Sequence, residues 1–261
     1  MDGIRLGTSG WSYDHWAGVL YPPGLPVARR RDVYVERFDT VELNASFYRW
    51  PGERPFHRWG EVLPDGFTMS VKASRWISHG RRLHDPDGAW ARRLTAAMRA
   101  LGKHAGIVLI QLPADFPRTP ETAGRLRDFL ASLPDDVRVA TELRHPSWDD
   151  EETYRILEER RAAYVVMSGA HLPCVLRATA DFVYLRWHGP SPDHLYVGSY
   201  SEGDLRWWAD RIREWRGQGR EVWGYFDNDD RGFAVGNCER LRELLSRAPG
   251  GRADRRPGVT R

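Results

Sequence analysis

Polar and charged side chains recur two residues apart at the ends of short apolar segments. These pairs are Glu42 with Asn44, Ser70 with Lys72, Glu142 with Arg144, and Arg186 with His188. In a β-strand, residues two apart point to the same face. Carboxylates and imidazoles can transfer protons, and arginine and lysine bind phosphate or carboxylate oxygens. The spacing therefore predicts acid–base groups and anion-binding groups on shared strand faces.

Three side chains are candidate catalytic residues. Glu42 or Glu142 would serve as a general base, and His188 as an acid or a second base. The candidate substrate-binding residues are Trp11, Tyr13, Asn44, Lys72, Gln111, Arg144, His145, Arg186 and Asn228. The cations would hold an anion, because the guanidinium fork suits phosphate oxygens, and the aromatic rings would stack on bases or sugars. This set predicts a hydrolase of the phosphodiesterase type, acting on a phosphorylated or polyanionic substrate such as nucleic acid.

Two other functions fit the same residues. Glu42 and Glu142 could be the paired carboxylates of a carbohydrate-active hydrolase, although basic neighbours would keep both ionised and weaken the acid role. A protein that binds nucleic acid or a metabolite without turnover would need the same pocket. Strong salt dependence would indicate a nucleic-acid partner, and turnover would separate an enzyme from a binding protein. An anionic small molecule or a nucleic acid is therefore the expected partner.

Side chains of the types that bind metal ions are also present. They are Glu42, Glu142, His145, His188 and Asp227. No HxH or HExxH spacing organises them, and the ligands of a barrel come from separate strands, so spacing neither assigns nor excludes a metal. Three cationic side chains nearby would disfavour a further cation. We therefore assign no metal ligand and leave the cofactor and the oligomeric state open.

Short apolar segments alternate with amphipathic helical segments, the pattern of βαβ units and a parallel sheet. The expected strands are Ile4–Ser9, Thr40–Ala45, Thr68–Lys72, Gly106–Gln111, Val137–Glu142, Ala163–Ser168, Phe182–His188 and Val222–Asp227. The expected helices are Val27–Arg37, Pro55–Leu63, Asp87–Leu101, Pro120–Leu133, Asp149–Arg161, Glu202–Gln218 and Asn237–Ser246. The connection Gly169–Ala180 is short, and we expect no full helix in it.

Length and strand number favour a closed barrel. The chain has 261 residues, and a (β/α)8 barrel typically has ~250. The segment Gly7–Gly10 lacks the GxGxxG spacing of an open nucleotide-binding sheet. We predict an α/β protein of one domain, a TIM-type (β/α)8 barrel with a closed parallel sheet over residues 1–247. Residues 248–261, rich in Gly, Pro and Arg, are predicted to be a disordered tail.

In such barrels the site lies at the C-terminal ends of the strands. Six of the eight expected strands carry polar or charged groups at that end. Each unpaired polar group would cost ~1–3 kcal/mol if it were buried. We therefore expect these groups to pair with one another, with water or with a ligand.

Composition predicts a cytoplasmic protein. The two cysteines, Cys174 and Cys238, lie far apart and form no CxxC motif, which indicates a reducing compartment. The N-terminus shows no signal peptide, and the longest apolar run, near Ile107–Ile110, is too short to span a bilayer. The net charge of +3 does not by itself indicate nucleic-acid binding. Only two of the 39 basic residues are lysines, which draws attention to Lys72 at a strand end.

Several short motifs occur in a specific order along the chain. They are Gly7–Trp11 with Tyr13, Trp16 and Tyr21–Pro22, then Glu42–Tyr48, Lys72, Ile77–His79, Gln111–Pro113, Glu142–Trp148, Arg186–Gly189, Tyr225–Asp229 and Asn237. In this order they resemble the YecE-like family, domain of unknown function 72, over nearly the whole chain up to about Leu245. The resemblance implies a TIM-type barrel and brings no reaction.

The chain departs from the family pattern at two strand ends. Ser168 stands where the family often has an acid, and Asp227 is the first polar residue of a motif that is usually asparagine-rich. A metal ligand supplied by the sixth strand is therefore in doubt.

Overall fold

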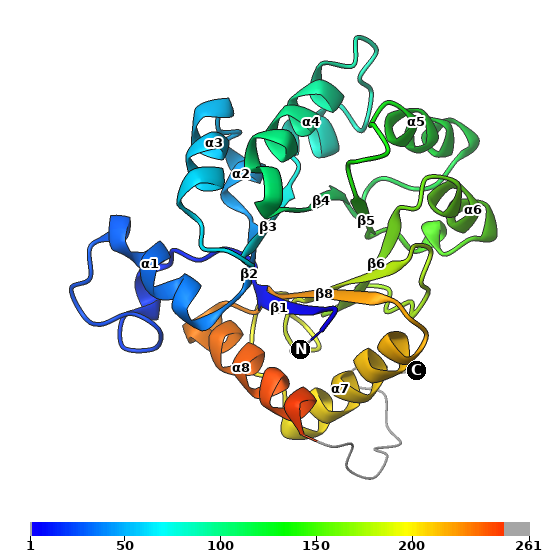
Figure 1. Ribbon diagram of the computed structural model, residues 1–261. Helices are drawn as coiled ribbons and strands as arrows, with labels where there is room; N and C mark the ends of the chain where they lie inside the picture. The colour runs from blue at the N-terminus through cyan, green and yellow to red at the C-terminus, as the bar shows by residue number, and fades with distance from the viewer. Residues whose placement is uncertain (1, 248–261) are drawn as a thin grey trace. The chain divides into compact units, whose positions relative to one another are not determined.

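The computed structural model describes residues 2–247, and Figure 1 shows the arrangement of their helices and strands. The strands are β1 (Ile4–Thr8), β2 (Thr40–Leu43), β3 (Thr68–Lys72), β4 (Ala105–Leu112), β5 (Val139–Leu143), β6 (Ala163–Ser168), β7 (Phe182–Trp187) and β8 (Glu221–Phe226). They form one sheet in the order β1-β8-β7-β6-β5-β4-β3-β2. The predicted fold class, a single-domain TIM-type (β/α)8 protein with parallel strands, is confirmed. The predicted tail, residues 248–261, lies outside the described residues.

Helices follow most of the strands. The α-helices are α1 (Val27–Arg37), α2 (Ala45–Tyr48), α3 (Glu53–Val62), α4 (Ala89–Leu101), α5 (Pro120–Ala131), α6 (Glu151–Glu159), α7 (Glu202–Gly217) and α8 (Phe233–Ser246). Short helical turns are η1 (Asp14–Trp16), η2 (Trp76–Gly80), η3 (Gly102–His104), η4 (Pro146–Trp148) and η5 (Asp230–Gly232). As expected, residues 169–180 connect β6 to β7 without a helix.

Most expected boundaries differ from the observed ones by no more than two residues, and the start of the last helix differs by four. Two of the differences have a clear local cause. The second strand ends at Leu43 instead of Ala45, because Ala45 begins the short helix α2 and the Ser46 hydroxyl donates back to the Leu43 carbonyl at 2.8 Å. The last helix begins at Phe233 instead of Asn237. Gly232 directly before it has a φ of +75°, a left-handed conformation that glycine adopts readily and that redirects the chain into α8.

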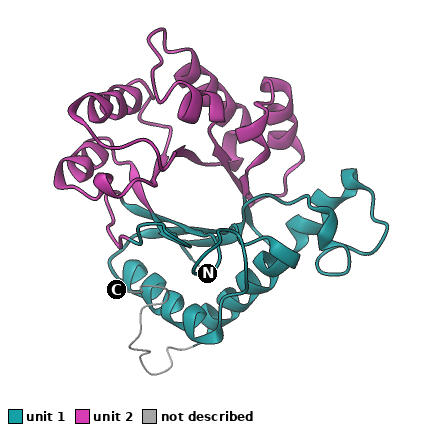
Figure 2. Cartoon of the chain, turned by 180° about the vertical axis from the view of Figure 1, so that it is seen from behind, with its two compact units in different colours: residues 1–41, 166–174, 181–261 teal, residues 42–165, 175–180 magenta. Residues whose placement is uncertain are grey.

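The chain divides into two compact units (Figure 2). Unit 1 comprises Met1–Val41, Val166–Cys174 and Asp181–Arg261, and unit 2 comprises Glu42–Val165 and Val175–Ala180.

In unit 1, strand β8 pairs with both β1 and β7. The register sets Thr8 opposite Phe226 and Phe226 opposite Trp187. The rings of Trp187 and Phe226 stack with centroids 4.3 Å apart. Gly224 allows this packing, since a Cβ atom there would lie only 2.6 Å from the Trp187 ring. The register brings the residues that follow these strands, including Asp227, to the same level.

In unit 2, strands β3, β4, β5 and β6 pair in chain order. The β4–β5 register places Gln111 beside Glu142. The β3–β4 register shifts between Met69 and Val71, where the Ser70 hydroxyl accepts a hydrogen bond from the backbone N–H of Ile107. Lys72 ends β3. The polar residues Lys72, Gln111 and Glu142 therefore lie at or near the carboxyl ends of the three neighbouring strands β3, β4 and β5.

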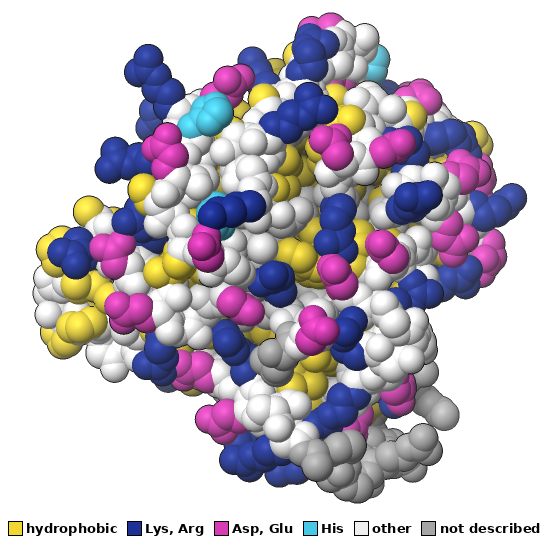
Figure 3. All heavy atoms as spheres, viewed as in Figure 1, with side chains coloured by type: hydrophobic (Ala, Val, Ile, Leu, Met, Phe, Trp, Pro, Cys, Tyr) yellow, Lys and Arg dark blue, Asp and Glu magenta, His cyan; other side chains and the backbone are white. Residues whose placement is uncertain are grey.

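Charges of both signs are interspersed on the face shown in Figure 3. Surface ion pairs occur in the described part of the chain, for example that of Arg240 with Glu202 at 2.7 Å. In the part of the chain that the structure describes, no helix has the length and apolar character that crossing a membrane requires.

Candidate functional site

Three cations of unit 2 act on one imidazole, that of His79. The His79 ring is half-buried, and this burial is the main cause of a pKa lowered from the ordinary value. The positive charges of Lys72, Arg144 and Arg75 lower the pKa further. We call these three cations the cation cluster. The lowered pKa keeps the imidazole neutral at pH 7, within a positive field.

Lys72 enters this group from the last position of β3 and is only 5% exposed. Its Nζ lies 4.3 Å from the centre of the Phe47 ring. The same ring meets His79 edge-on, with centroids 5.1 Å apart. Phe47, which is buried in the short helix α2, therefore contacts both the lysine and the imidazole.

Arg144 follows β5, and its side chain is 11% exposed. Its Nε donates to Oε1 of Glu142 at 2.6 Å, and the Glu142 side chain is fully buried. A hydrogen bond between two charged groups is strong and directional. The buried carboxylate thus holds the guanidinium in place, and the structure brings together these two residues of the predicted site.

Two predicted binding residues carry acceptor oxygens without a hydrogen-bond partner among residues 2–247. They are Oε1 of Gln111 and Oδ1 of Asn44. Gln111 is buried beside Glu142 in the β4–β5 ladder, and Asn44 is half-buried after β2. A buried acceptor without a partner costs ~1–3 kcal/mol unless water or a ligand donates to it. Gln111 is therefore suited to accept from a bound hydroxyl group or water molecule.

Two further predicted site residues belong to unit 2. Glu42 is fully buried in β2. His145 is half-buried, and its Nδ1 accepts from the backbone N–H of Ser147 at 3.1 Å, which caps the turn η4. His145 therefore has a local structural partner.

Sequence reasoning did not place His79 among the site residues, although it belongs to the motif Ile77–His79. The Ser78 hydroxyl donates to the Ser74 carbonyl at 3.1 Å, so it can accept from Nδ1 of His79, 3.0 Å away. This arrangement puts the ring proton on Nδ1 and leaves Nε2 as the basic nitrogen. In the sequence, only the motif Ile77–His79, which places the histidine seven residues after Lys72, could have indicated it.

In unit 1, two other predicted site residues, Arg186 and His188, meet Asp227. Arg186 is fully buried, and its NH2 donates to Oδ2 of Asp227 at 2.8 Å and to the Ser9 hydroxyl at 3.2 Å. Nδ1 of His188 lies 3.2 Å from the same carboxylate oxygen, and Nε2 lies 3.4 Å from NH1 of Arg186. These charges compensate one another inside the unit.

A second carboxyl group of unit 1, that of Asp229, was not predicted. Nε1 of Trp16 donates to its Oδ1 at 2.6 Å, and Nε2 of His15 lies 2.9 Å from its Oδ2. Burial raises the pKa of Asp229 to about 6, and the negative charge of Asp227 adds to that shift. The only sequence signal was its place in the motif Tyr225–Asp229.

The remaining predicted binding residues, Trp11, Tyr13 and Asn228, have partners within unit 1. The half-buried Trp11 ring packs edge-on against Tyr34 with centroids 5.9 Å apart. The Tyr13 hydroxyl donates to the Ser9 carbonyl at 2.7 Å. Nδ2 of Asn228 donates to the Gly198 carbonyl at 2.9 Å and to Oδ1 of Asn237 at 2.8 Å. These contacts give the three side chains a role in local structure.

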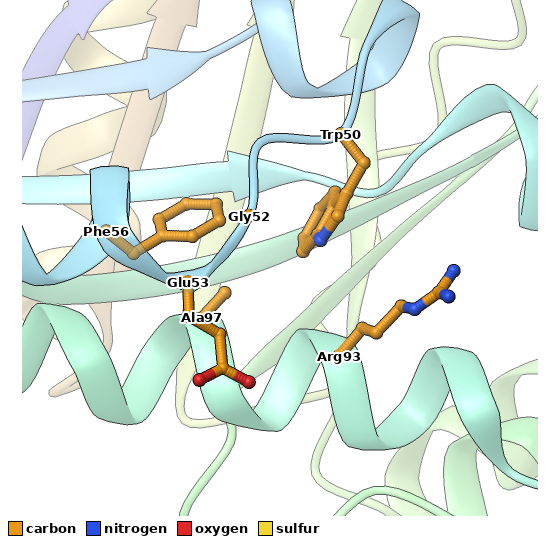
Figure 4. Close-up of a pocket in the computed structure, with 6 residues that line it drawn as sticks. All are labelled: Trp50, Gly52, Glu53, Phe56, Arg93 and Ala97. Atoms are coloured by element: carbon orange, nitrogen blue, oxygen red, sulfur yellow. The ribbon is translucent and has the colours of Figure 1, made fainter.

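A cavity of about 490 Å³ lies elsewhere in unit 2, between α3 and α4 (Figure 4). Its lining residues are Trp50, Gly52, Glu53, Phe56, Arg93 and Ala97. None of them belongs to the predicted site. Within residues 2–247, no group of three or more His, Cys, Asp or Glu side chains gathers in a way that could hold a metal ion.

Comparison with known proteins gives the chain its relatives. UPF0759 protein YunF of Bacillus subtilis (strain 168) is 27% identical over 270 residues, which cover 93% of this chain and 94% of that protein. The crystal structure of the DUF72 family protein TM1631 from Thermotoga maritima MSB8 is similar with a TM-score of 0.83 and 27% identity, over 94% of this chain and 99% of that one. The structure of SacUVDE has a TM-score of 0.60 at 10% identity, over 92% of this chain and 99% of that one.

The family described as "Protein of unknown function DUF72" matches residues 5–259. This match spans almost the whole sequence and confirms the resemblance drawn from the motifs. The chain belongs to the DUF72 family.

Proposed function

We propose that this protein is an enzyme that acts on a phosphorylated or polyanionic substrate, and that the cation cluster of unit 2 binds the phosphate group. The observation that carries the proposal is that one ring, that of Phe47, contacts both Nζ of Lys72 at 4.3 Å and the imidazole of His79 at 5.1 Å between centroids. The positive charges of the cation cluster, which also lower the pKa of His79, agree with this placement. Ammonium and guanidinium groups bind phosphate oxygens through charge-assisted hydrogen bonds. The Glu142–Arg144 ion pair orients one of these cations before any ligand binds.

The finer form of the proposal is hydrolysis of a phosphodiester. Water attacks phosphorus and passes one proton to Nε2 of His79, and the P–O bond to the leaving group breaks. The leaving oxygen takes up a proton from solvent and departs as an alcohol, which leaves a phosphate monoester. The hydrogen bond between Nδ1 and the Ser78 hydroxyl favours the tautomer that this step needs. Oε1 of Gln111 is suited to accept from the attacking water or from a substrate hydroxyl.

The earlier candidates for catalysis have different surroundings. The Arg144 guanidinium favours the charged form of Glu142, which suits a positioning role better than the proton-donating role that a glycosidase needs. His188 is fully buried between Arg186 and Asp227. Catalytic roles for Glu42, Glu142 and His188 remain predictions. SacUVDE, a UV damage endonuclease, shares the fold, which adds nucleic acid to the substrates that should be tried.

The two lysines of the chain provide a matched test. Lys72→Met removes a charge from the cation cluster, and Lys103→Met removes one from an exposed ion pair with Asp65. Calorimetry with inorganic phosphate and turnover of bis(p-nitrophenyl) phosphate are measured for both variants and for His79→Gln. We expect Lys72→Met to lose at least about tenfold in phosphate affinity, since a charge-assisted hydrogen bond contributes ~1.5–3 kcal/mol. Lys103→Met should bind as the unmodified chain does.

Each result has a definite meaning. Equal phosphate affinity in the two lysine variants would exclude the cation cluster as the binding site. Phosphate binding without turnover of the diester, of sugar phosphates or of oligonucleotides would favour a binding protein. Turnover of glycosides alone would favour the carbohydrate-active alternative.

A further inference from the structure

Two aromatic side chains of unit 2 are exposed to an unusual degree. Tyr48 is 69% exposed and Trp76 is 58% exposed, whereas the tryptophans at positions 16, 148, 187 and 208 are fully buried. Large aromatic rings bury much of their surface in folded proteins, so an exposed pair needs a reason.

Both rings come from elements that also carry the cation cluster or its contacts. Tyr48 ends α2 directly after Phe47, whose ring contacts Nζ of Lys72 and the imidazole of His79. Trp76 begins η2, the turn that contains His79 three residues later. The aromatic surface and the phosphate-binding groups therefore belong to one local structure.

The backbone at Trp76 is held firmly. Its N–H donates to the Ser74 hydroxyl at 3.2 Å, and its carbonyl accepts from Arg81 at 2.7 Å. The turn η2 is a π-helix, a rare element that often occurs at functional sites. Because the backbone is already fixed, an exposed ring here can stack on a ligand without a further loss of backbone entropy.

We infer that Trp76 and Tyr48 form a stacking surface for unpaired bases of single-stranded nucleic acid, whose phosphates bind the cation cluster. The inference rests on the proposed function and narrows its substrate class. In a duplex, neighbouring base pairs cover the base faces, so these side chains can reach only bases that are already unstacked. Alternating cations and aromatic rings are typical of surfaces that bind single strands.

Fluorescence anisotropy tests this inference without needing turnover. Three labelled probes of equal length are compared: a single-stranded 12-mer, the duplex, and an abasic single strand with the same number of phosphates. Removing one stacking ring weakens binding by about 5- to 150-fold in other systems. We expect Trp76→Ala and Tyr48→Ala each to lose affinity for the single strand within that range, with abasic-strand binding unchanged and Trp76→Phe restoring most of the loss.

Val27→Ala, which trims an exposed apolar side chain of α1 in unit 1, is the control and should bind like the unmodified chain. Equal affinity of the unmodified chain for the single strand and the abasic strand would overturn base stacking. Base stacking would also be overturned if both alanine variants bound the single strand normally while Lys72→Met bound it weakly. That result would still support phosphate binding by the cation cluster. Failure to bind any oligonucleotide would overturn the inference, and calorimetry with inorganic phosphate would then report separately on the proposed function.

Discussion

The charged groups of unit 1 and unit 2 are built from similar residues but act on different neighbours. In unit 1 the fully buried Arg186 is bonded to Asp227 and lies beside His188, so the charges compensate one another. In unit 2 Arg144 is likewise paired with the buried Glu142, yet the charges of Lys72, Arg75 and Arg144 all lower the pKa of one half-buried imidazole, that of His79. Strand-end position alone therefore does not define a role. We expect the first arrangement to matter for stability and the second to matter for ligand binding.

The largest effect should come from breaking the charge compensation of unit 1. Arg186→Met leaves the carboxylate of Asp227 without its arginine in a buried site. Breaking a buried ion pair from one side typically costs ~3–5 kcal/mol. We expect the free energy of unfolding, measured by urea denaturation at pH 7, to fall by about that amount.

The double variant Arg186→Met with Asp227→Leu serves as the control. It removes both charges, so much of the lost stability should return. A loss below about 1 kcal/mol in the single variant would contradict a structural role for this pair and would make Arg186 a ligand-binding candidate again.

The second contrast lies in the pH dependence of stability. Asp229 has a pKa raised from 3.8 to about 6, so the folded chain binds more protons than the unfolded chain between these values. Stability contributed by Asp229 should therefore be lost as the pH rises from about 4 to 6. His79 has a lowered pKa, so its effect has the opposite sign, and stability should be lost as the pH falls below about 6.5.

Urea denaturation between pH 4 and pH 8 separates the two contributions. Asp229→Asn should remove the first slope, and His79→Gln should remove the second. After allowance for partial exposure, we expect Asp229→Asn to change the free energy of unfolding by about 1 kcal/mol across its window, and His79→Gln to change it in the opposite direction. If the two substitutions changed the pH dependence of the free energy of unfolding in the same direction, the two environments would not differ as described.

A smaller effect of opposite direction is expected at Gln111. Its buried Oε1 has no hydrogen-bond partner within residues 2–247, and an unsatisfied acceptor is costly. Gln111→Met retains the side-chain length and removes the acceptor, so the free energy of unfolding should rise by up to ~1 kcal/mol while turnover of the phosphodiester falls. Loss of stability instead would mean that an ordered water satisfies this oxygen in solution.

The fold could be predicted almost completely from local pattern, because strand and helix periodicity in a (β/α)8 chain is set by neighbouring residues. The missed helix α2 spans only four residues, too few to show a period. Site residues could be predicted by type and strand position, and so Glu142 and Arg144 were identified together. The two titratable groups that were not predicted, His79 and Asp229, lie in loops and turns. Their surroundings depend on contacts between distant segments, such as Trp16 with Asp229, which no local pattern encodes.

The smallest change in stability, and the sharpest test of the comparison, is expected for Arg75→Ala. Arg75 is exposed, and an exposed substitution away from special features changes the free energy of unfolding by less than ~0.5 kcal/mol. Its charge nevertheless contributes to the lowered pKa of His79, so removal should raise that pKa toward its ordinary value. Proton NMR of the imidazole Hε1 across pH 4–8 measures the shift, with Arg240→Ala in unit 1 as the control, since no contribution of Arg240 to the His79 pKa is expected. If the pKa of His79 stayed the same in Arg75→Ala, the cation cluster would shrink to Lys72 and Arg144, and the phosphate would have to bind nearer the buried carboxylate of Glu142.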